Sequence, residues 1–346
     1  MKWEDEAPAG LASPALLVPR MNMDEAIEPS PAGITERNEP DRSRSDVCPT
    51  ARAIPMSNGR TIVVRPVRQQ DEADLSDLYD GLDIGDRYLR FFSAYRPTRD
   101  FIHKLANPAP REARAVAELN EPGGRRLVGE AGYSLLTNGN GEFEMVVARD
   151  WRGWLGPYLL DVVIELAAGN GVPNLEAEVL ARNTSMVAAL RAHGCVRLGH
   201  GGWNECRLMV GTGRQGPTWS DADDRPHVLV ETSGAGWPLE AAAECAGMRV
   251  ITCGGPTRDH SCPVVSGHEC ALVTGADAIV VRNASPKPIW RTVTRNHTCS
   301  HPDIPVLIDP LGDHAQAMTI DDVRVPAFLH FHLETARRSG APDSRR

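Results

Sequence analysis

The residues whose types and spacing are best suited to chemistry lie on either side of Arg149. A β-branched, apolar stretch ends at Val147 and runs into a turn that contains Gly153 and Gly156, after which an apolar helical pattern begins. A helix that starts after such a turn presents backbone N–H groups without helical partners, and its dipole favours negative charge there. Arg149 and Arg152 add positive charge at the same place. This segment is therefore predicted to bind an anionic group such as a pyrophosphate.

Two carboxylates precede this turn on the same predicted strand. Glu142 and Glu144 are two residues apart, so their side chains point to the same face of the strand. A carboxylate at a cleft can take the proton from an attacking amine as a general base. We therefore predict Glu142 and Glu144 as catalytic candidates, with a solvated strand face as the alternative for both. Glu176 and Glu178, on a neighbouring predicted strand, are further candidates for a structural or substrate-orienting role.

A mixed sheet with helices must position these residues. Turn signals at 121–124 and 138–141 separate three strands, which predicts an antiparallel meander. A βαβ crossover begins near residue 150, which leaves two strands free to diverge with a helix N-terminus directed into the gap. The predicted strands are 60–67, 113–119, 126–136, 142–148, 175–180 and a pair within 196–210, and the predicted helices are 71–82, 86–92, 155–168 and 185–192.

Three segments of residues 52–212 resemble the GCN5-related N-acetyltransferase (GNAT) family. The segment 64–71 is similar to the opening strand and helix of that family, and 142–160 is similar to its central strand, phosphate loop and helix. Asn183 to Met186, followed by Leu190 and Gly194, is similar to its later Asn-containing motif. All three occur in the family's order and at its spacing.

The resemblance implies an N-acetyltransferase that uses acetyl-CoA as co-substrate. The acceptor would be a primary amine of a small molecule or a protein lysine. Glu142 matches a glutamate that several members carry before the phosphate loop, and Asn183 matches an Asn that contacts the cofactor, although capping of the following helix explains Asn183 equally well. The residues implied in cofactor binding are Met145, Val146, Val147, Arg149, Arg152, Gly153, Trp154, Leu155, Gly156 and Asn183.

The chain also departs from the family pattern. Its phosphate loop is one residue shorter, Trp154 stands where a glycine is usual, and Pro157 removes one N–H donor. Residues 185–193 lack the tyrosine with which many members protonate the leaving thiolate. The alternative is a catalytically degenerate GNAT fold that binds acyl-CoA or serves as a regulatory protein.

A second, smaller domain is predicted after a polar linker over 213–224. Residues 225–340 alternate apolar strands with helices, which is typical of a buried parallel sheet. In outline they resemble a response-regulator receiver, but Glu231-Thr232 and Arg282-Asn283 stand where a receiver carries its acidic and phospho-acceptor residues. We therefore expect no phosphorylation. A last helix is predicted over 327–338.

The C-terminal cysteines are the remaining candidates for chemistry. Cys253, Cys262, Cys270 and Cys299 lie among several histidines, but their spacing is wider than the Cys-x2–4-Cys pairs of zinc modules. Free or buried thiols are therefore expected and no metal is predicted, with a redox or metal sensor as a third functional hypothesis. Disulfides are not expected in a cytosolic chain of this size.

Length and charge narrow the class of protein. A chain of 346 residues suggests two domains. The formal net charge of −9 argues against a nucleic-acid coat protein, and no apolar run is long enough to span a membrane. We therefore expect no nucleic-acid or membrane partner and a cytoplasmic location. Residues 1–51 are predicted to be a disordered tail, because their composition cannot supply a core.

Overall fold

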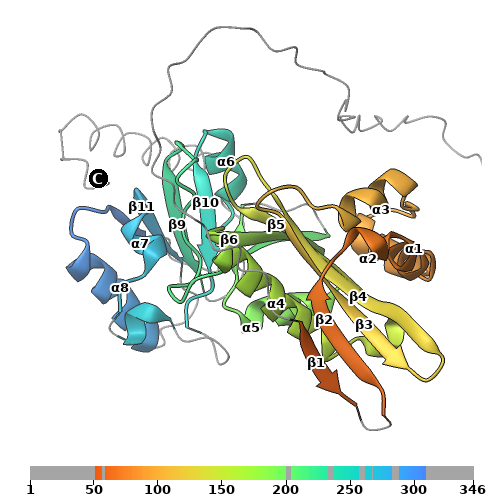
Figure 1. The fold of residues 1–346 in the computed structure, drawn as a ribbon. Helices are drawn as coiled ribbons and strands as arrows, with labels where there is room; N and C mark the ends of the chain where they lie inside the picture. Colours follow the sequence, from red (N-terminus) through yellow and green to blue (C-terminus); the bar gives the residue numbers. More distant parts are fainter. Residues whose placement is uncertain are drawn as a thin grey trace, which may run out of the picture. The chain divides into compact units, whose positions relative to one another are not determined.

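The computed structural model describes residues 51–56, 59–199, 204–232, 237–256, 262–266, 268–282 and 288–308. The tail predicted over 1–51, except for its last residue, and the helix predicted over 327–338 lie outside these ranges. The described residues form a mixed sheet of 12 strands with helices packed against it (Figure 1). The predicted mixed α/β class is therefore confirmed.

The first five strands are antiparallel neighbours in chain order. They are β1 (Arg52–Pro55), β2 (Thr61–Pro66), β3 (Ala113–Glu121), β4 (Gly124–Leu135) and β5 (Gly141–Val147). The turn that joins β4 to β5 contains Gly139 at a φ of 80°, a left-handed conformation that favours glycine. The predicted meander is confirmed, and the structure adds β1, which was not among the predicted strands.

Helices cover both faces of this meander. One face carries η1 (Gln69–Asp71), α1 (Glu72–Asp80), α2 (Ile84–Phe91) and α3 (Arg99–Ala106). Val116 on β3 packs with α1 and α3, whereas its neighbours Ala115 and Ala117 belong to the core under the later helices. This alternation is the period-two pattern of a strand buried on both sides. The helix α3 was not predicted, since its polar residues mask an apolar face formed by Ile102 and Leu105.

The second half of this region builds the crossover. It contains η2 (Arg149–Trp151), α4 (Leu155–Gly169), β6 (Asn174–Leu180), α5 (Thr184–Ala192), β7 (Val196–Leu198) and β8 (Glu205–Gly211). Leu155, Leu159 and Leu160 of α4 are completely buried, which anchors the first turn of this helix against the sheet. The predicted helices and strands are confirmed here to within a few residues.

The strands β5 and β6 are parallel neighbours only where they begin. Gly141 pairs with Leu175 and Glu142 with Glu176, and no pairing is present beyond these residues. A Cβ atom at Gly141 would lie 2.9 Å from the side chains of both Leu175 and Tyr133, so glycine permits the close approach at this apex. The predicted divergence of the two strands is therefore confirmed.

The sheet continues into the C-terminal part without a break. This part contains β9 (His227–Thr232), α6 (Glu240–Cys245), β10 (Arg249–Cys253), η3 (Pro263–Ser266), α7 (Ala271–Thr274), β11 (Ala278–Arg282), α8 (Pro288–Ser300) and β12 (Val306–Ile308). Its four strands are parallel in the order β10-β9-β11-β12, which confirms the predicted parallel sheet. On the other side β10 pairs antiparallel with β7, so both predicted domains share one sheet.

The segment predicted as a linker packs against both parts. Trp219 is buried, stacks on His227 at 4.2 Å between ring centroids, and donates from Nε1 to the carbonyl of Leu272 at 2.7 Å. The backbone N–H of Thr218 donates to Asn174 at 2.9 Å. The predicted domain boundaries and the receiver resemblance stay predictions. Over the described ranges, no helix combines the length and the apolar character needed to cross a bilayer.

Candidate active site

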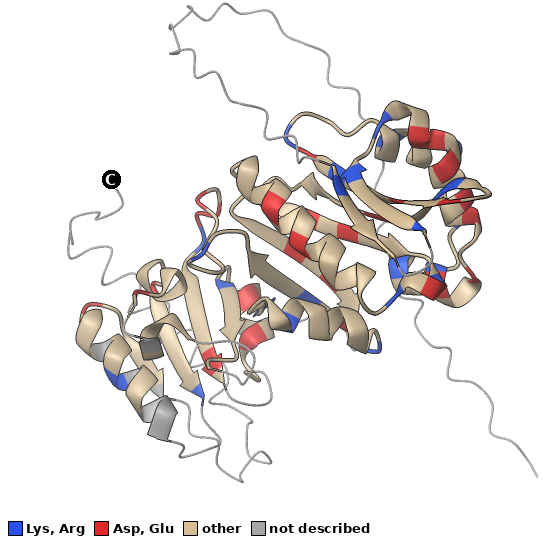
Figure 2. Cartoon of the chain, turned by 60° about the horizontal axis from the view of Figure 1, so that its bottom comes forward, with Lys and Arg blue, Asp and Glu red and all other residues tan. Residues whose placement is uncertain are grey.

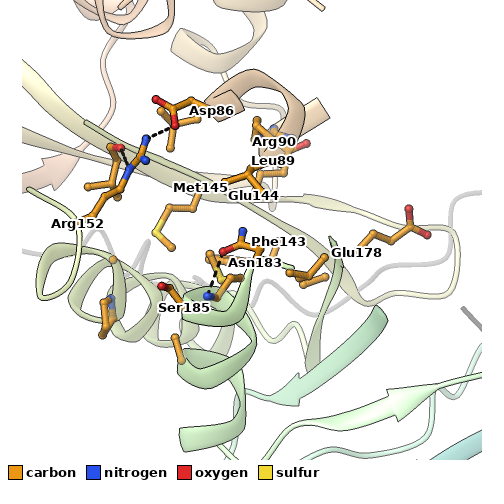
Figure 3. Close-up of a pocket in the computed structure, with 18 of the residues that line it drawn as sticks. Asp86, Leu89, Arg90, Phe143, Glu144, Met145, Arg152, Glu178, Asn183 and Ser185 are labelled. Atoms are coloured by element: carbon orange, nitrogen blue, oxygen red, sulfur yellow. Dashed lines mark hydrogen bonds and ion pairs between the residues drawn. The ribbon is translucent and has the colours of Figure 1, made fainter. Parts of the chain in front are cut away.

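A pocket of about 290 Å³ opens where β5 and β6 diverge (Figure 3). Figure 3 places Asp86 and Arg90 of α2 on one side of β5, and Asn183 and Ser185 of the α5 start on the other. Its walls come from β5, β6, α2, α5 and the first turn of α4. The lining residues are Leu82, Asp86, Leu89, Arg90, Phe143 to Val147, Arg152, Gly153, Gly156, Pro157, Ala177 to Val179, Asn183, Ser185, Met186 and Ala189.

The free edge of β5 faces this pocket. The N–H of Ala148 donates to the carbonyl of Val128 on β4 at 2.9 Å. Because backbone groups of successive strand residues point to opposite sides, Val146 also bonds toward β4, whereas Met145 and Val147 direct their N–H and C=O groups into the gap. The sequence analysis gave Met145, Val146 and Val147 alike as candidates, and the register places the backbone groups of Met145 and Val147 at the open edge.

The first turn of α4 closes one end of the pocket. Gly153 has a φ of 100°, a left-handed conformation, with open space where a Cβ would lie. Gly153 and Gly156 both line the pocket, so backbone N–H groups can approach a ligand there. Trp154 and Leu155 do not line the pocket: Trp154 is 40% exposed and Leu155 is completely buried.

Arg149 and Arg152, in the segment between β5 and α4, form ion pairs with acidic residues at the start of α2. Arg152 contacts Asp86 at 2.8 Å between Nη2 and Oδ1, and its Nε donates to the carbonyl of Val147 at 3.2 Å. Arg149 forms an ion pair with Asp83 and lines an adjacent cavity of about 570 Å³ rather than the pocket itself. Figure 2 shows such mixing of acidic and basic residues across the described elements. Sequence reasoning missed these acids, although two aspartates at a helix start are a recognisable anionic feature.

Glu144 belongs to a buried ionic network. It contacts Arg114 at 2.5 Å and Arg90 at 3.0 Å, and Arg114 also contacts Glu130 at 2.5 Å. Tyr79 donates to Glu130 at 2.9 Å. Burial alone would raise the pKa of Glu144, but the guanidinium groups outweigh it and hold that pKa below the usual value. Glu144 is therefore a poor proton acceptor.

Arg114 and Glu130 carry a signal that sequence reasoning overlooked. Each is a charged residue with an alanine or a glycine on both sides in the sequence, and a buried charge requires a partner. The pairing itself lies outside any local pattern, because β3 and β4 bring the two side chains together.

Glu142 lies at the apex of the opening, directly before the lining residue Phe143. Its side chain is exposed and makes no hydrogen bond or ion pair with any described residue. Partial desolvation raises the pKa of Glu142, and the nearby carboxylates of Glu144 and Glu178 raise it further. This environment suits a general base better than that of Glu144. Glu142 itself does not line the pocket.

The two carboxylates of β6 differ in role. Glu176 is buried and accepts hydrogen bonds from Asn138 at 2.8 Å and Asn140 at 2.7 Å, so it fixes the turn before β5. Glu178 lines the pocket with a 57% exposed side chain and contacts Arg207 at 3.4 Å. Of these two glutamates, only Glu178 lines the pocket and can contact a substrate there.

Asn183 has a feature of each of the two roles that the sequence suggested, the capping of α5 and a place at the pocket. Its side chain accepts from the N–H of Met186 at 3.3 Å, which caps α5, and the same residue lines the pocket. His193, at the end of α5, contacts Asp161 at 3.2 Å.

No known protein-family profile matches the chain. Over about 45% of its length, however, it is similar to solved GNAT acetyltransferases. The GNAT domain of PAT from S. lividans has 20% identity, 46% coverage of this chain and 96% of that chain, and a TM-score of 0.40. The phosphinothricin acetyltransferase from Sinorhizobium meliloti, in complex with AcCoA, has 17% identity, coverages of 44% and 89%, and a TM-score of 0.36. The ribosomal-protein-S5-alanine acetyltransferase from Vibrio fischeri has 13% identity, coverages of 45% and 94%, and a TM-score of 0.35.

The C-terminal thiols are separate from this pocket. Cys253, Cys262, Cys270 and Cys299 are free, and burial raises the pKa values of the first three, which disfavours the reactive thiolate. Across the described ranges, no three His, Cys, Asp or Glu side chains are grouped so that they could hold a metal ion. In the same C-terminal part, His297 forms a buried contact with Glu231 at 2.6 Å.

Proposed function

We propose that the chain transfers an acetyl group from acetyl-CoA to a primary amine. The observation that carries this proposal is the opening between β5 and β6, with a free strand edge on one side and the start of α4 at its end. An amide-rich arm can pair with such an edge, and a pyrophosphate suits a helix start. The acceptor is a small-molecule amine or a protein lysine.

Residues on three sides of the pocket fit acetyl-CoA. The backbone groups of Met145 and Val147 would pair with the pantetheine amides. Gly153 and Gly156 let the α4 N-terminus approach the pyrophosphate, and Arg152 supplies a positive charge beside them. Asn183 faces the same space from α5.

The proposed reaction needs one proton acceptor. The neutral amine attacks the thioester carbonyl, the C–N bond forms and the C–S bond breaks. Glu142 takes the proton that the amine loses, and the CoA thiolate takes a proton from water, since no tyrosine is found among the described residues that line the pocket. Glu144 acts indirectly, because its ion pairs with Arg90 and Arg114 fix the strand beside the pocket.

A second candidate is a GNAT-fold protein that binds acyl-CoA for regulation and does not turn it over. It is favoured by the pairing of Arg152 with Asp86, which neutralises the charge expected to meet the pyrophosphate. A screen of the full chain with acetyl-CoA, a panel of amines and a lysine peptide library separates the two. Release of CoA thiol with a mass gain on the acceptor supports the enzyme, binding without release supports the regulator, and absence of binding refutes both.

Reversing the charge of Arg152 tests the cofactor site. Arg152→Glu places a like charge beside the pyrophosphate, and we expect acetyl-CoA to bind about 10- to 100-fold more weakly by calorimetry. Arg214→Glu is the control. The exposed Arg214 follows the end of β8, which pairs with the start of β6, so it lies at the strand ends opposite the turn that carries Arg152. Equal affinities for the two variants would place the cofactor elsewhere.

The acid limb of the pH–rate profile tests the proton acceptor. Glu142 acts only when deprotonated, and its surroundings raise its pKa. The rate is therefore expected to fall as the pH drops through a value above that of an ordinary glutamate, and to lose this limb in Glu142→Gln. An acceptor amine with a lower pKa is expected to shift the part of the profile that reports deprotonation of the amine. It should leave the limb assigned to Glu142 unchanged. A limb that stays unchanged in Glu142→Gln would assign it to another group.

A further inference from the structure

The helix α2 lies beside the pocket. It spans Ile84–Phe91, and none of these residues is fully buried. Its last turn packs Phe91 against the rings of Tyr79 and Phe101, whereas its first turn is held by charged contacts. Asp86 in its first turn contacts Arg152, and Arg90 in its last turn contacts Glu144. Between them, the guanidinium carbon of Arg182 lies 4.5 Å from the ring centroid of Tyr88. The Arg152 side chain is 39% exposed, so its ion pair with Asp86 breaks at lower cost than the buried pair between Arg90 and Glu144.

Arg152 makes two contacts that compete with the proposed binding of the cofactor. Its Nη2 contacts Asp86 at 2.8 Å, so its charge is neutralised before any phosphate arrives. Its Nε donates to the carbonyl of Val147 at 3.2 Å, and this carbonyl lies on the strand edge proposed for the pantetheine arm. Both contacts must be exchanged if acyl-CoA is to bind as proposed.

Asp86 also opposes a phosphate directly. Its side chain is only 10% exposed and lines the pocket, and its carboxylate is 3.9 Å from Arg149 as well. The backbone N–H of Asp86 donates to the carboxylate of Asp83 at 2.8 Å, and this bond fixes the backbone of Asp86 in the first turn of α2. A buried carboxylate in this position repels an incoming pyrophosphate unless the ion pair rearranges.

We propose that Arg152 exchanges its ion pair from Asp86 to the cofactor phosphates when acyl-CoA binds, and that this exchange releases the first turn of α2. The inference rests on the proposed function. Because α2 also carries Arg90, which contacts Glu144 next to Glu142, the exchange communicates the presence of the cofactor to the acceptor side of the pocket. Asp86 is thus a positioning residue that holds the Arg152 guanidinium until the cofactor phosphates replace it.

The test is the affinity of the full chain for coenzyme A, measured by calorimetry. Asp86→Asn removes the competing charge, and we expect it to tighten binding about 3- to 10-fold. Asp150→Asn is the matched control. Asp150 is exposed in the same loop, forms no ion pair with any residue that the structure describes, and loses the same charge on substitution. Its affinity is expected to change less than about 2-fold.

Hydrogen exchange of α2 provides a readout that a general charge effect would not move. Coenzyme A is expected to speed amide exchange over residues 84–88 in the natural chain and in Asp150→Asn. In Asp86→Asn, exchange is already fast and coenzyme A leaves it unchanged. Weaker or equal binding by Asp86→Asn, or slower exchange in α2 on binding, would overturn the inference while leaving the cofactor site in place. Absence of coenzyme A binding in all three proteins would instead refute the proposed function and the inference with it.

Discussion

Glu142→Gln is expected to slow acetyl transfer about 10²- to 10⁴-fold, the usual contribution of general-base catalysis. The substitution keeps the shape of the side chain and removes the proton acceptor. The Glu142 side chain is exposed, makes no hydrogen bond or ion pair with any residue that the structure describes, and does not line the pocket. The melting temperature and the affinity for acetyl-CoA should therefore change little, so that the loss is confined to the chemical step.

Glu144→Gln serves as the comparison, since it removes the same charge two residues away on the same face. Its carboxylate contacts Arg114 and Arg90, so this variant is expected to lose stability before it loses chemistry. Steady-state rates, calorimetry and thermal melts of both variants decide the matter. A near-normal rate in Glu142→Gln, or a folded Glu144→Gln with the larger rate loss, would move the role of base away from Glu142.

Arg114→Met is expected to lower the free energy of unfolding by about 3–5 kcal/mol, as measured by urea denaturation. The Arg114 side chain is 5% exposed and contacts Glu130, which is completely buried, and Glu144. Methionine fills a similar volume but leaves both carboxylates without their shared cation. Loss of one partner of a buried pair is costly because the remaining charge has no solvation.

Two further variants make this prediction specific. Arg125→Met removes an arginine whose side chain is 48% exposed and whose contacts, to Asp74 at 3.8 Å and to Glu118 at 3.5 Å, are long, so the change should stay within about 1 kcal/mol. The double variant Arg114→Met/Glu130→Met is expected to recover part of the stability. Equal losses for Arg114→Met and Arg125→Met would show that the network contributes no more than a surface pair.

Local sequence patterns determined the order of elements around the site. The β-branched run that ends at Val147, the glycines of the following turn, and the apolar pattern from Leu155 onward each depend on residues close together in the chain. They predicted β5, the turn and α4, and the hairpin signals before them predicted the meander, as the structure confirms. The divergence of β5 and β6 followed from the same order, because a crossover after hairpins leaves two parallel strands with unlike neighbours.

Only the tertiary structure decided which of these residues are free to act. The sequence favoured Glu142 over Glu144 only through the family resemblance. The structure adds a physical reason, because Arg114 of β3 and Arg90 of α2 form ion pairs with Glu144. The sequence analysis read Arg152 as a free cation, whereas Asp86, far earlier in the chain, neutralises it. Strand register likewise selected Met145 over Val146 at the open edge. Periodicity reports burial and local geometry, but ion pairs between distant segments depend on how the elements pack, so their effect on charge could not be read from spacing.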